Sequence, residues 1–350
     1  MSTLQIINLA IMLAFFLCYS YQFFYITVAW WMKRQKKPLP ARRTNSPKAL
    51  RMLRRSPILR MNNADMNKLQ ADLHIHTTAS DGVLTPSQVV FRAKECGLTC
   101  LAVSDHDTIA GIAQAQTAAE QAGIQVIPAV ELSTGGEQEI HILGYGLPLH
   151  DERLDAFLDH MAQERTARAE RMLAKLTALG MPLELAEIPC KNGGVVGRPQ
   201  IARAMIACGY VKTVAEAFDR FLGKGCPAYV PREMLEPAQA IAFLRSLRAV
   251  PVLAHPGLLG WPDEALAQVL PAWMEAGLLG MEVYHPAHLP DQFDHWTACA
   301  REHGLLVTGG SDFHTDGDKH AALGAMCAKW PEMHANVQRL LDTIETLKGN

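Results

Sequence analysis

The segment Asp72-Leu73-His74-Ile75-His76 alternates polar and apolar side chains in the pattern of a β-strand. Because successive side chains of a strand point to opposite faces, His74 and His76 point the same way. Leu73 and Ile75 then pack on the other face against helices. Two imidazoles side by side on one strand are a natural ligand pair for a metal ion. The segment therefore predicts a strand that contributes to a metal site.

Further short apolar runs follow this segment, and helical patterns lie between most of them. The predicted strands are Ala71–His76, Leu101–His106, Gln125–Glu131, Ile140–Tyr145, Val250–His255, Gly280–His285 and Leu305–Asp312. The predicted helices are Ser87–Cys96, Ile109–Ala122, Pro237–Arg248, Asp263–Ala276 and Asp291–His303. Alternation of strands and helices predicts an α/β fold with a parallel sheet, and seven strands of this kind favour a barrel.

The region 151–235 interrupts this alternation. It holds a long helical pattern that ends at Gly180, a polar turn with Gly193 and Gly194, and two further short helices. We predict a helical insertion here, between a first barrel part at 70–150 and a second at 236–350. No internal repeats accompany it.

The N-terminal segment has a different character. Residues 4–32 contain no charged side chain, and about 20 apolar residues suffice to cross a bilayer. We predict a transmembrane helix within residues 1–33 and a basic linker at 34–69, which would anchor a cytoplasmic catalytic part to the inner membrane. The alternative is a mistaken start, with translation beginning at Met61 or Met66.

Composition excludes some classes of function. The net charge of the 350 residues is −2, so no global basic field attracts nucleic acid, and we expect no DNA partner. Eight cysteines are scattered without a Cys-x-x-Cys pair, which favours a reducing compartment and buried thiols. Nothing in the chain indicates an obligate protein partner.

Each predicted strand carries a histidine or a carboxylate, usually where it stops. The strand ends read Ser104-Asp105-His106-Asp107, Glu131, Ala254-His255-Pro256, Tyr284-His285-Pro286 and Ser311-Asp312-Phe313-His314, while His141 lies early in its strand. A single carboxylate after a strand is usually a helix cap, as Asp105 or Asp107 could be. Repetition at every strand instead predicts a metal site, because barrels of this type build their chemistry at the C-terminal rim.

These motifs resemble those of the PHP family, named for polymerase and histidinol phosphatase. The resemblance rests on His74-x-His76, Ser104-Asp105-His106-Asp107, Glu131, His141, Ala254-His255-Pro256 and Ser311-Asp312-x-His314, and it covers roughly residues 70 to 327. It implies a distorted seven-stranded β/α barrel with two or three metal ions. The implied ligands are His74, His76, Glu131 and Asp312 for one ion, Glu131, His141 and His255 for a second, and Asp81, His106 and His314 for a third.

Asp81 indicates a subgroup within the family, because many family members carry histidine at this position. Aspartate with a helical insertion after the fourth strand is similar to a subgroup that includes nucleoside 3′,5′-bisphosphate phosphatases and 5′-to-3′ exonucleases acting on short RNA. The resemblance thus implies a metal-dependent phosphoesterase for small nucleotides or short RNA. Two alternatives stay open. One is a histidinol-phosphatase-like enzyme for another small metabolite, which Asp81 disfavours. The other is a non-catalytic PHP module, which the complete ligand set disfavours.

The chemistry follows from the ions. Cations about 3.5–4 Å apart can lower the pKa of a shared water toward neutrality and neutralise charge on phosphate oxygens. Mixed imidazole and carboxylate ligands suit manganese, our first expectation, or iron or zinc. We predict catalytic roles for Asp81, His106 and His314, since either histidine could protonate the leaving group if it is not committed to metal. Asp72 and Asp105 are expected to orient imidazoles.

Substrate contacts are expected from the insertion. Arginines recur every three residues on the long helix, and another follows Gly197 at the start of the next helix, where free N–H groups favour anions. Guanidinium groups bind phosphate through paired hydrogen bonds. The predicted contacts are Arg165, Arg168 and Arg198, together with His285 of the barrel, whereas Arg171 is less favoured. Histidines without motif support are expected at the surface or in packing: His150, His160, His288, His295, His303, His320 and His334.

Overall fold

The computed structural model describes residues 69–349, apart from 136–137, 189–195, 233 and 317–320. The predicted transmembrane helix, the basic linker and the alternative starts lie outside these residues, as do Gly193, Gly194, His320, Cys18 and Cys190. None of the helices that the structure describes combines the length and apolarity needed to cross a membrane. The six cysteines in the described part of the chain are free thiols.

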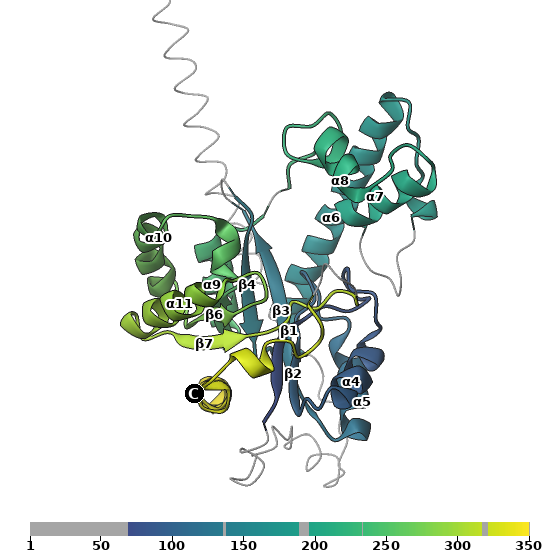
Figure 1. Ribbon diagram of the computed structural model, residues 1–350. Coiled ribbons are helices and arrows are strands. Elements are labelled where there is room, and N and C mark those ends of the chain that lie inside the picture. The colour runs from purple at the N-terminus through teal and green to yellow at the C-terminus, as the bar shows by residue number, and fades with distance from the viewer. Residues whose placement is uncertain (1–68, 136–137, 189–195, 233, 317–320, 350) are drawn as a thin grey trace, which may run out of the picture. The chain divides into compact units, whose positions relative to one another are not determined.

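Seven strands form one sheet, in the same order as along the chain (Figure 1). They are β1 (Ala71–Ile75), β2 (Cys100–Val103), β3 (Gln125–Thr134), β4 (Ile140–Tyr145), β5 (Val250–Leu253), β6 (Gly280–Tyr284) and β7 (Leu306–Gly309). The chain beyond β7 returns to the first strand, where Phe313 bridges Ile75 and its carbonyl accepts from His76 N at 2.9 Å. The sheet is thus a nearly closed barrel, as predicted.

The prediction of a fully parallel sheet is wrong at one strand. β4 runs antiparallel to both β3 and β5, whereas the other neighbouring pairs are parallel. Only residues 135–139 connect β3 to β4, and a parallel crossover needs a dozen residues or more. The chain therefore turns back in a hairpin. As a consequence, the start of β4 lies beside the end of β3, with His141 opposite Ser133.

Helices follow most of the strands. They are α4 (Pro86–Glu95), α5 (Ile112–Ala122), α9 (Pro237–Ser246), α10 (Asp263–Glu275), α11 (Pro290–Glu302) and α12 (Met333–Gly349). The start of α4 shows why the sequence specifies them: Thr85 caps the helix by accepting from Gln88 N, and Pro86 occupies the first turn. The helix α12, which was not predicted from the sequence, buries Val337 and Leu340 in the main core.

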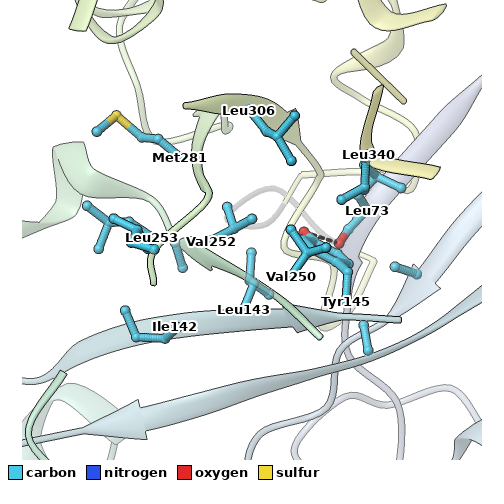
Figure 2. Close-up of a cluster of buried hydrophobic side chains, with 14 of the residues drawn as sticks. Leu73, Ile142, Leu143, Tyr145, Val250, Val252, Leu253, Met281, Leu306 and Leu340 are labelled. Carbon is cyan, nitrogen blue, oxygen red and sulfur yellow. Dashed lines mark hydrogen bonds between the residues drawn. The ribbon is translucent and has the colours of Figure 1, made fainter. Parts of the chain in front are cut away.

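The main core lies among the barrel strands and the helices packed on them. Figure 2 shows Leu143, Val252 and Met281 in this cluster, all fully buried. Tyr145 is also fully buried, and its hydroxyl donates to the carbonyl of Leu73 at 2.9 Å (Figure 2). Because a buried hydroxyl without a partner would cost about 1–3 kcal/mol, this bond lets Tyr145 fill the interior and join β4 to β1, which are not neighbours in the sheet.

The insertion has a core of its own. Its elements are α6 (Glu152–Ala178), η1 (Leu185–Glu187), α7 (Arg198–Ala207), α8 (Val214–Ala217) and η3 (Phe218–Leu222) (Figure 1). The first half of α6 contributes Leu154 and Leu158 to the main core. Its second half contributes Met172, Leu173 and Leu176 to the insertion core. One continuous helix therefore belongs to both hydrophobic clusters.

Candidate metal centre

The carboxylate of Glu131, in β3, is the centre of the site. It is 1% exposed, and imidazoles from five different positions of the chain face its two oxygens. Oε1 lies 2.8 Å from His141 Nδ1 and 3.1 Å from His255 Nε2. Oε2 lies 3.2 Å from His74 Nε2, 3.1 Å from His76 Nε2 and 3.1 Å from His106 Nδ1. Both oxygens are thus surrounded by potential metal ligands.

The structure brings all nine predicted ligands together. Three groups have ligand atoms within 4.8 Å of one another: His74, His76, Glu131 and Asp312; His106, Glu131 and His141; and His76, Asp81, His106 and His314. His255 joins them through its contact with Glu131. The antiparallel course of β4 explains why His141 belongs here, since an early position in an antiparallel strand lies at the late end of its neighbour. The grouping differs from the predicted one in that His76 and His106 each belong to two groups.

The donor atoms fit divalent cations. Several are buried and form no regularly oriented hydrogen bond within the described residues, although they lie at ion-pair distance from one another: His74 Nε2, both ring nitrogens of His76, His106 Nδ1, His141 Nδ1 and Glu131 Oε2. Leaving a buried polar atom unpaired costs about 1–3 kcal/mol, so native proteins rarely gather them in one place. Imidazole and carboxylate donors are also the usual ligands of divalent transition metals. Metal ions would satisfy these atoms.

Three residues at or beside the centre have an unusual backbone conformation. Asp107, His255 and Asp312 have positive φ angles of 52°, 28° and 50°. Such angles are uncommon for residues other than glycine and cluster at functional sites. Each of the three residues follows the end of a strand or a bridge. The turn at each point directs the side chain toward the rim instead of continuing the ladder.

Gly310 permits the close approach of the last strand to the first. A Cβ atom at this position would lie 2.4 Å from both the backbone N and the Cβ of His74. No side chain fits at that distance, so only glycine lets the chain after β7 carry Asp312 and His314 toward β1. The adjoining loop is held by Asp72, which accepts from Ser311 N and from Gly324 N, each at 2.8 Å.

The role of Asp72 and Asp105 differs from the prediction. Asp105 accepts from Thr77 N at 2.7 Å and from the hydroxyl of Ser80 at 2.6 Å, and like Asp72 it bonds no imidazole. Burial raises the pKa of both carboxyls, although their hydrogen bonds oppose the shift. Both aspartates therefore position the loops that carry ligands. They do not orient the rings.

Glu282, which was not among the predicted site residues, orients one ring directly. It is fully buried in β6, and His74 Nδ1 lies 3.0 Å from its Oε1. Its Oε2 accepts from His255 N at 2.9 Å, so one carboxylate positions two ligands from different strands. A carboxylate in the interior of the apolar segment Gly280–Tyr284 was the available signal, because glutamate is almost never fully buried without a partner.

Charge in the cluster is balanced between carboxylates and rings. Burial opposes ionisation of Glu131, yet the surrounding histidines hold its pKa well below the usual range. Burial likewise opposes protonation of His76 and His141, but Asp312 and Glu131 raise the pKa of His76, and Glu131 and Glu139 that of His141, each to about 10. For His106, burial prevails and lowers the pKa to about 4. His106 is therefore neutral at pH 7, as a ligand must be.

Comparisons with known proteins agree with this geometry. The PHP domain matches residues 72–182. The 5′-3′ exoribonuclease Rnm of Escherichia coli K12 is 36% identical over 248 residues, covering 69% of this chain and 84% of that protein. The 3′,5′-nucleoside bisphosphate phosphatase of Chromobacterium violaceum is 32% identical over 281 residues, covering 77% and 99%.

The chain belongs to the PHP family.

One solved structure supports the same assignment, and a second has a similar fold. A protein from Bifidobacterium adolescentis, described as a metal-dependent phosphoesterase, matches with a TM-score of 0.70 and 29% identity, over 79% of this chain and 96% of that one. An amidohydrolase from Chromobacterium violaceum, solved with sulfate and without metal, matches with a TM-score of 0.66 and 32% identity, over 72% and 90%. The chain is thus a metal-dependent phosphoesterase, and the alternative of a non-catalytic PHP module falls away.

A cavity of about 430 Å³ adjoins the PHP metal ligands. Asp81, His106, His141 and His255 line it on the barrel side. The insertion supplies apolar side chains such as Phe218 and Ile201 and most of the positive charge. The arginines in the wall are Arg165, Arg168, Arg198 and Arg232. The predicted substrate arginines therefore share one cavity with part of the metal cluster.

The arginines are held in different ways. Arg168 Nε donates to the carbonyl of Val230 at 2.8 Å. Arg198 lies 3.3 Å from Glu139 Oε2, with its guanidinium 5.5 Å from the ring centre of Phe218. Arg171 is outside the cavity wall and donates to the carbonyl of Ala167 in its own helix, which agrees with its lower ranking.

His285, predicted as a substrate contact with a structural role as the alternative, lies beside Asp312. Its side chain is 4% exposed and absent from the cavity wall, and Nε2 lies 3.3 Å from Asp312 Oδ2. This position suits a residue that orients Asp312 better than one that touches substrate. His288 packs nearby, with Nδ1 2.7 Å from the carbonyl of Val283, as expected for a packing residue.

Proposed function

We propose that this PHP phosphoesterase hydrolyses phosphate esters of small nucleotides, releasing the 3′-phosphate of nucleoside 3′,5′-bisphosphates or cleaving short RNA from its 5′ end. One observation carries the proposal: four arginines line the cavity that the metal ligands also line. A simple monoester has one phosphate, which the metal centre can bind. The arginines indicate a substrate with a second anionic group.

The metal centre would break the ester bond. The three ligand groups around Glu131, Asp312 and Asp81 would hold two or three divalent ions, manganese in our proposal, which supply Lewis acidity and an activated water when bound. Glu131 faces two of these groups and would fix their separation. We assign the proton for the leaving oxygen to whichever of His106 and His314 does not hold an ion, since both belong to the group around Asp81.

The insertion would hold the other end of the substrate. Guanidinium groups bind phosphate through two parallel hydrogen bonds, which fix its orientation as well as its position. Arg198 is well placed for this, because it lies at the first position of α7 and lines the cavity. Similarity to the Chromobacterium bisphosphate phosphatase and the Escherichia exoribonuclease supports the same class of substrate.

A substrate comparison tests the proposal. Purified protein with Mn²⁺ is offered adenosine 3′,5′-bisphosphate, a short 5′-phosphorylated RNA and histidinol phosphate, and released phosphate and nucleotides are quantified. We expect turnover of at least one of the first two and little of the third. Turnover of histidinol phosphate alone would refute the nucleotide assignment and favour the phosphomonoesterase alternative.

Two arginine variants test whether an arginine of the cavity wall binds a phosphate of the substrate. Arg198→Gln should raise KM for the nucleotide substrate by about tenfold or more, because a hydrogen bond between charged groups is lost. Arg220→Gln is the matched control, since this arginine of the insertion has a side chain 58% exposed and lies outside the cavity wall. Equal kinetics of the two variants would argue against a phosphate contact at Arg198.

A further inference from the structure

Asp107 occupies an unusual position between the metal ligands and the arginines. Its side chain is 1% exposed, and it directly follows His106. Its Oδ1 accepts from Ser133 N at 2.9 Å, near the end of β3. Its Oδ2 accepts from Arg165 Nη2 at 2.6 Å and from Arg232 Nη2 at 2.8 Å. One carboxylate therefore joins the rim of the barrel to two guanidinium groups.

Arg232 is the more deeply buried of the two partners. Its side chain is 6% exposed, against 20% for Arg165, and both line the cavity. The Nε atom of Arg232 is buried and has no hydrogen-bond partner among the described residues. A guanidinium has five N–H donors, and Asp107 takes only one from each arginine. Each of the two arginines therefore keeps N–H donors that Asp107 does not use, and both arginines line the cavity.

The balance of charges in the cavity wall also indicates an anionic ligand. Asp107 can neutralise only one of its two arginine partners, and Arg168 and Arg198 add to the excess in the same cavity wall. Glu139, which faces Arg198, and Asp81, which lines the same cavity, offset part of this excess. An uncompensated buried cation is costly unless a counterion is paired with it. An anionic group in the cavity would supply that counterion.

We propose that Arg232 contacts the second phosphate of the substrate, and that Asp107 is a positioning residue that fixes Arg232 and Arg165 relative to the metal ligands. This inference rests on the proposed function and names residues for it. Because Asp107 is bonded both to the barrel rim and to the arginines, it sets how far the second phosphate lies from the ester that is cleaved. It would therefore select substrates by the spacing of their two phosphates.

The test compares two substrates that differ only in the second phosphate, adenosine 3′,5′-bisphosphate and adenosine 3′-monophosphate. Arg232→Gln and Asp107→Asn should each lose at least about tenfold more kcat/KM on the bisphosphate than on the monophosphate, mainly through KM. Arg232→Lys, which keeps the charge and loses the planar fork, should recover part of the loss. Equal losses on both substrates would overturn the proposal, because a general structural role affects both.

Controls separate folding from positioning. Asp159→Asn and Arg220→Gln remove the same side-chain types from exposed positions of the insertion and should behave like the native chain. Metal content and the thermal midpoint are measured for every variant. If Asp107→Asn does not fold, the two Arg232 variants still decide the outcome.

A binding measurement keeps this test independent of the proposed function. If the native enzyme turns over neither nucleotide, the substrate assignment fails, and sulfate binding to the metal-loaded protein is followed by calorimetry instead. We expect Arg232→Gln to weaken sulfate binding by about tenfold relative to Arg220→Gln. Unchanged sulfate affinity in Arg232→Gln would refute the anion contact itself.

Discussion

The Nδ1 atom of His74 lies 3.0 Å from Oε1 of Glu282, and both side chains are fully buried. This contact fixes the orientation of a ring whose other nitrogen faces the metal centre. Partners of this kind select the tautomer of a ligating histidine and raise its basicity. The carboxylate thereby acts on the centre without touching an ion.

Replacing Glu282 should therefore weaken metal binding. We expect Glu282→Gln to lower the affinity for Mn²⁺ by about 10–100-fold, as for other partners of ligating histidines. Competition with a chelator, measured without substrate, gives the affinity. Glu302→Gln, at an exposed position of α11, is the control. Equal affinity of the two variants would show that the contact with His74 does not tune the site.

Removal of the central carboxylate should have the largest effect. Glu131 faces five imidazoles, so Glu131→Gln should lower both the metal content and kcat, the latter by on the order of a thousandfold. Elemental analysis gives the metal content, and the rate of phosphate release gives kcat. Glu345→Gln, exposed on α12, serves as control. Substantial activity in Glu131→Gln would mean that the ions are held without it.

Metal binding should release protons. The pKa values of His76 and His141 are raised to about 10 in the metal-free protein, so both rings are protonated at pH 8. A metal ion binds only the neutral imidazole, and each ring it occupies must lose its extra proton. Against the effect of burial, Glu282, Glu131 and Asp312 raise the pKa of His74 as well. Calorimetry at pH 8 in buffers of different ionisation enthalpy should therefore report a net release of protons, and affinity should rise with pH. Heats that are independent of buffer would contradict this.

A methyl group at Gly310 should disturb the junction of the first and last strands. Gly310→Ala places Cβ 2.4 Å from the backbone of His74, so the strands must separate. We expect a loss of about 1–3 kcal/mol in the free energy of unfolding, seen in urea titrations, together with weaker metal binding. Gly349→Ala meets no atom within 4 Å and should be close to neutral. A neutral Gly310→Ala would show that the junction can adapt.

Two arginines of α6 make a matched pair. Arg168 lines the cavity, whereas Arg171, three residues later, bonds its own helix outside the cavity wall. Arg168→Ala should raise KM for a nucleotide substrate by about tenfold, and Arg171→Ala should leave it nearly unchanged. A similar effect of both would indicate a diffuse electrostatic contribution, which raised ionic strength would suppress.

Local sequence patterns were sufficient to predict many of the strands and helices. Period-two alternation and strand-end polar residues predicted β1 and its two histidines, and proline and glycine signals predicted most helices. The antiparallel direction of β4 could also have been predicted, because five residues between Thr134 and Ile140 cannot form a parallel crossover. The prediction of a parallel strand followed from assuming that strands and helices alternate throughout the chain. The helix α12 was missed because no strand follows it.

The remaining site residues could not be read from local pattern. Asp107 and Arg232 are 125 residues apart, and nothing near either one indicates the other. Glu282 and His74 are 208 residues apart. The first pair forms only when the insertion has folded against the barrel, and the second only when β1 and β6 are both in the barrel. The sequence shows which residue types are present, whereas the fold determines which of them come into contact.

The sheet ends at β1 and β7, and these two edges meet chiefly through the chain around Phe313. His74 and His76 belong to one side of that seam, and Asp312 and His314 to the other. An ion held by residues of both sides would cross-link the first and last strands of the barrel, where few backbone bonds do so. Binding of that ion would therefore close the barrel as well as supply the chemistry, so removal of metal should lower the stability of the fold together with the activity.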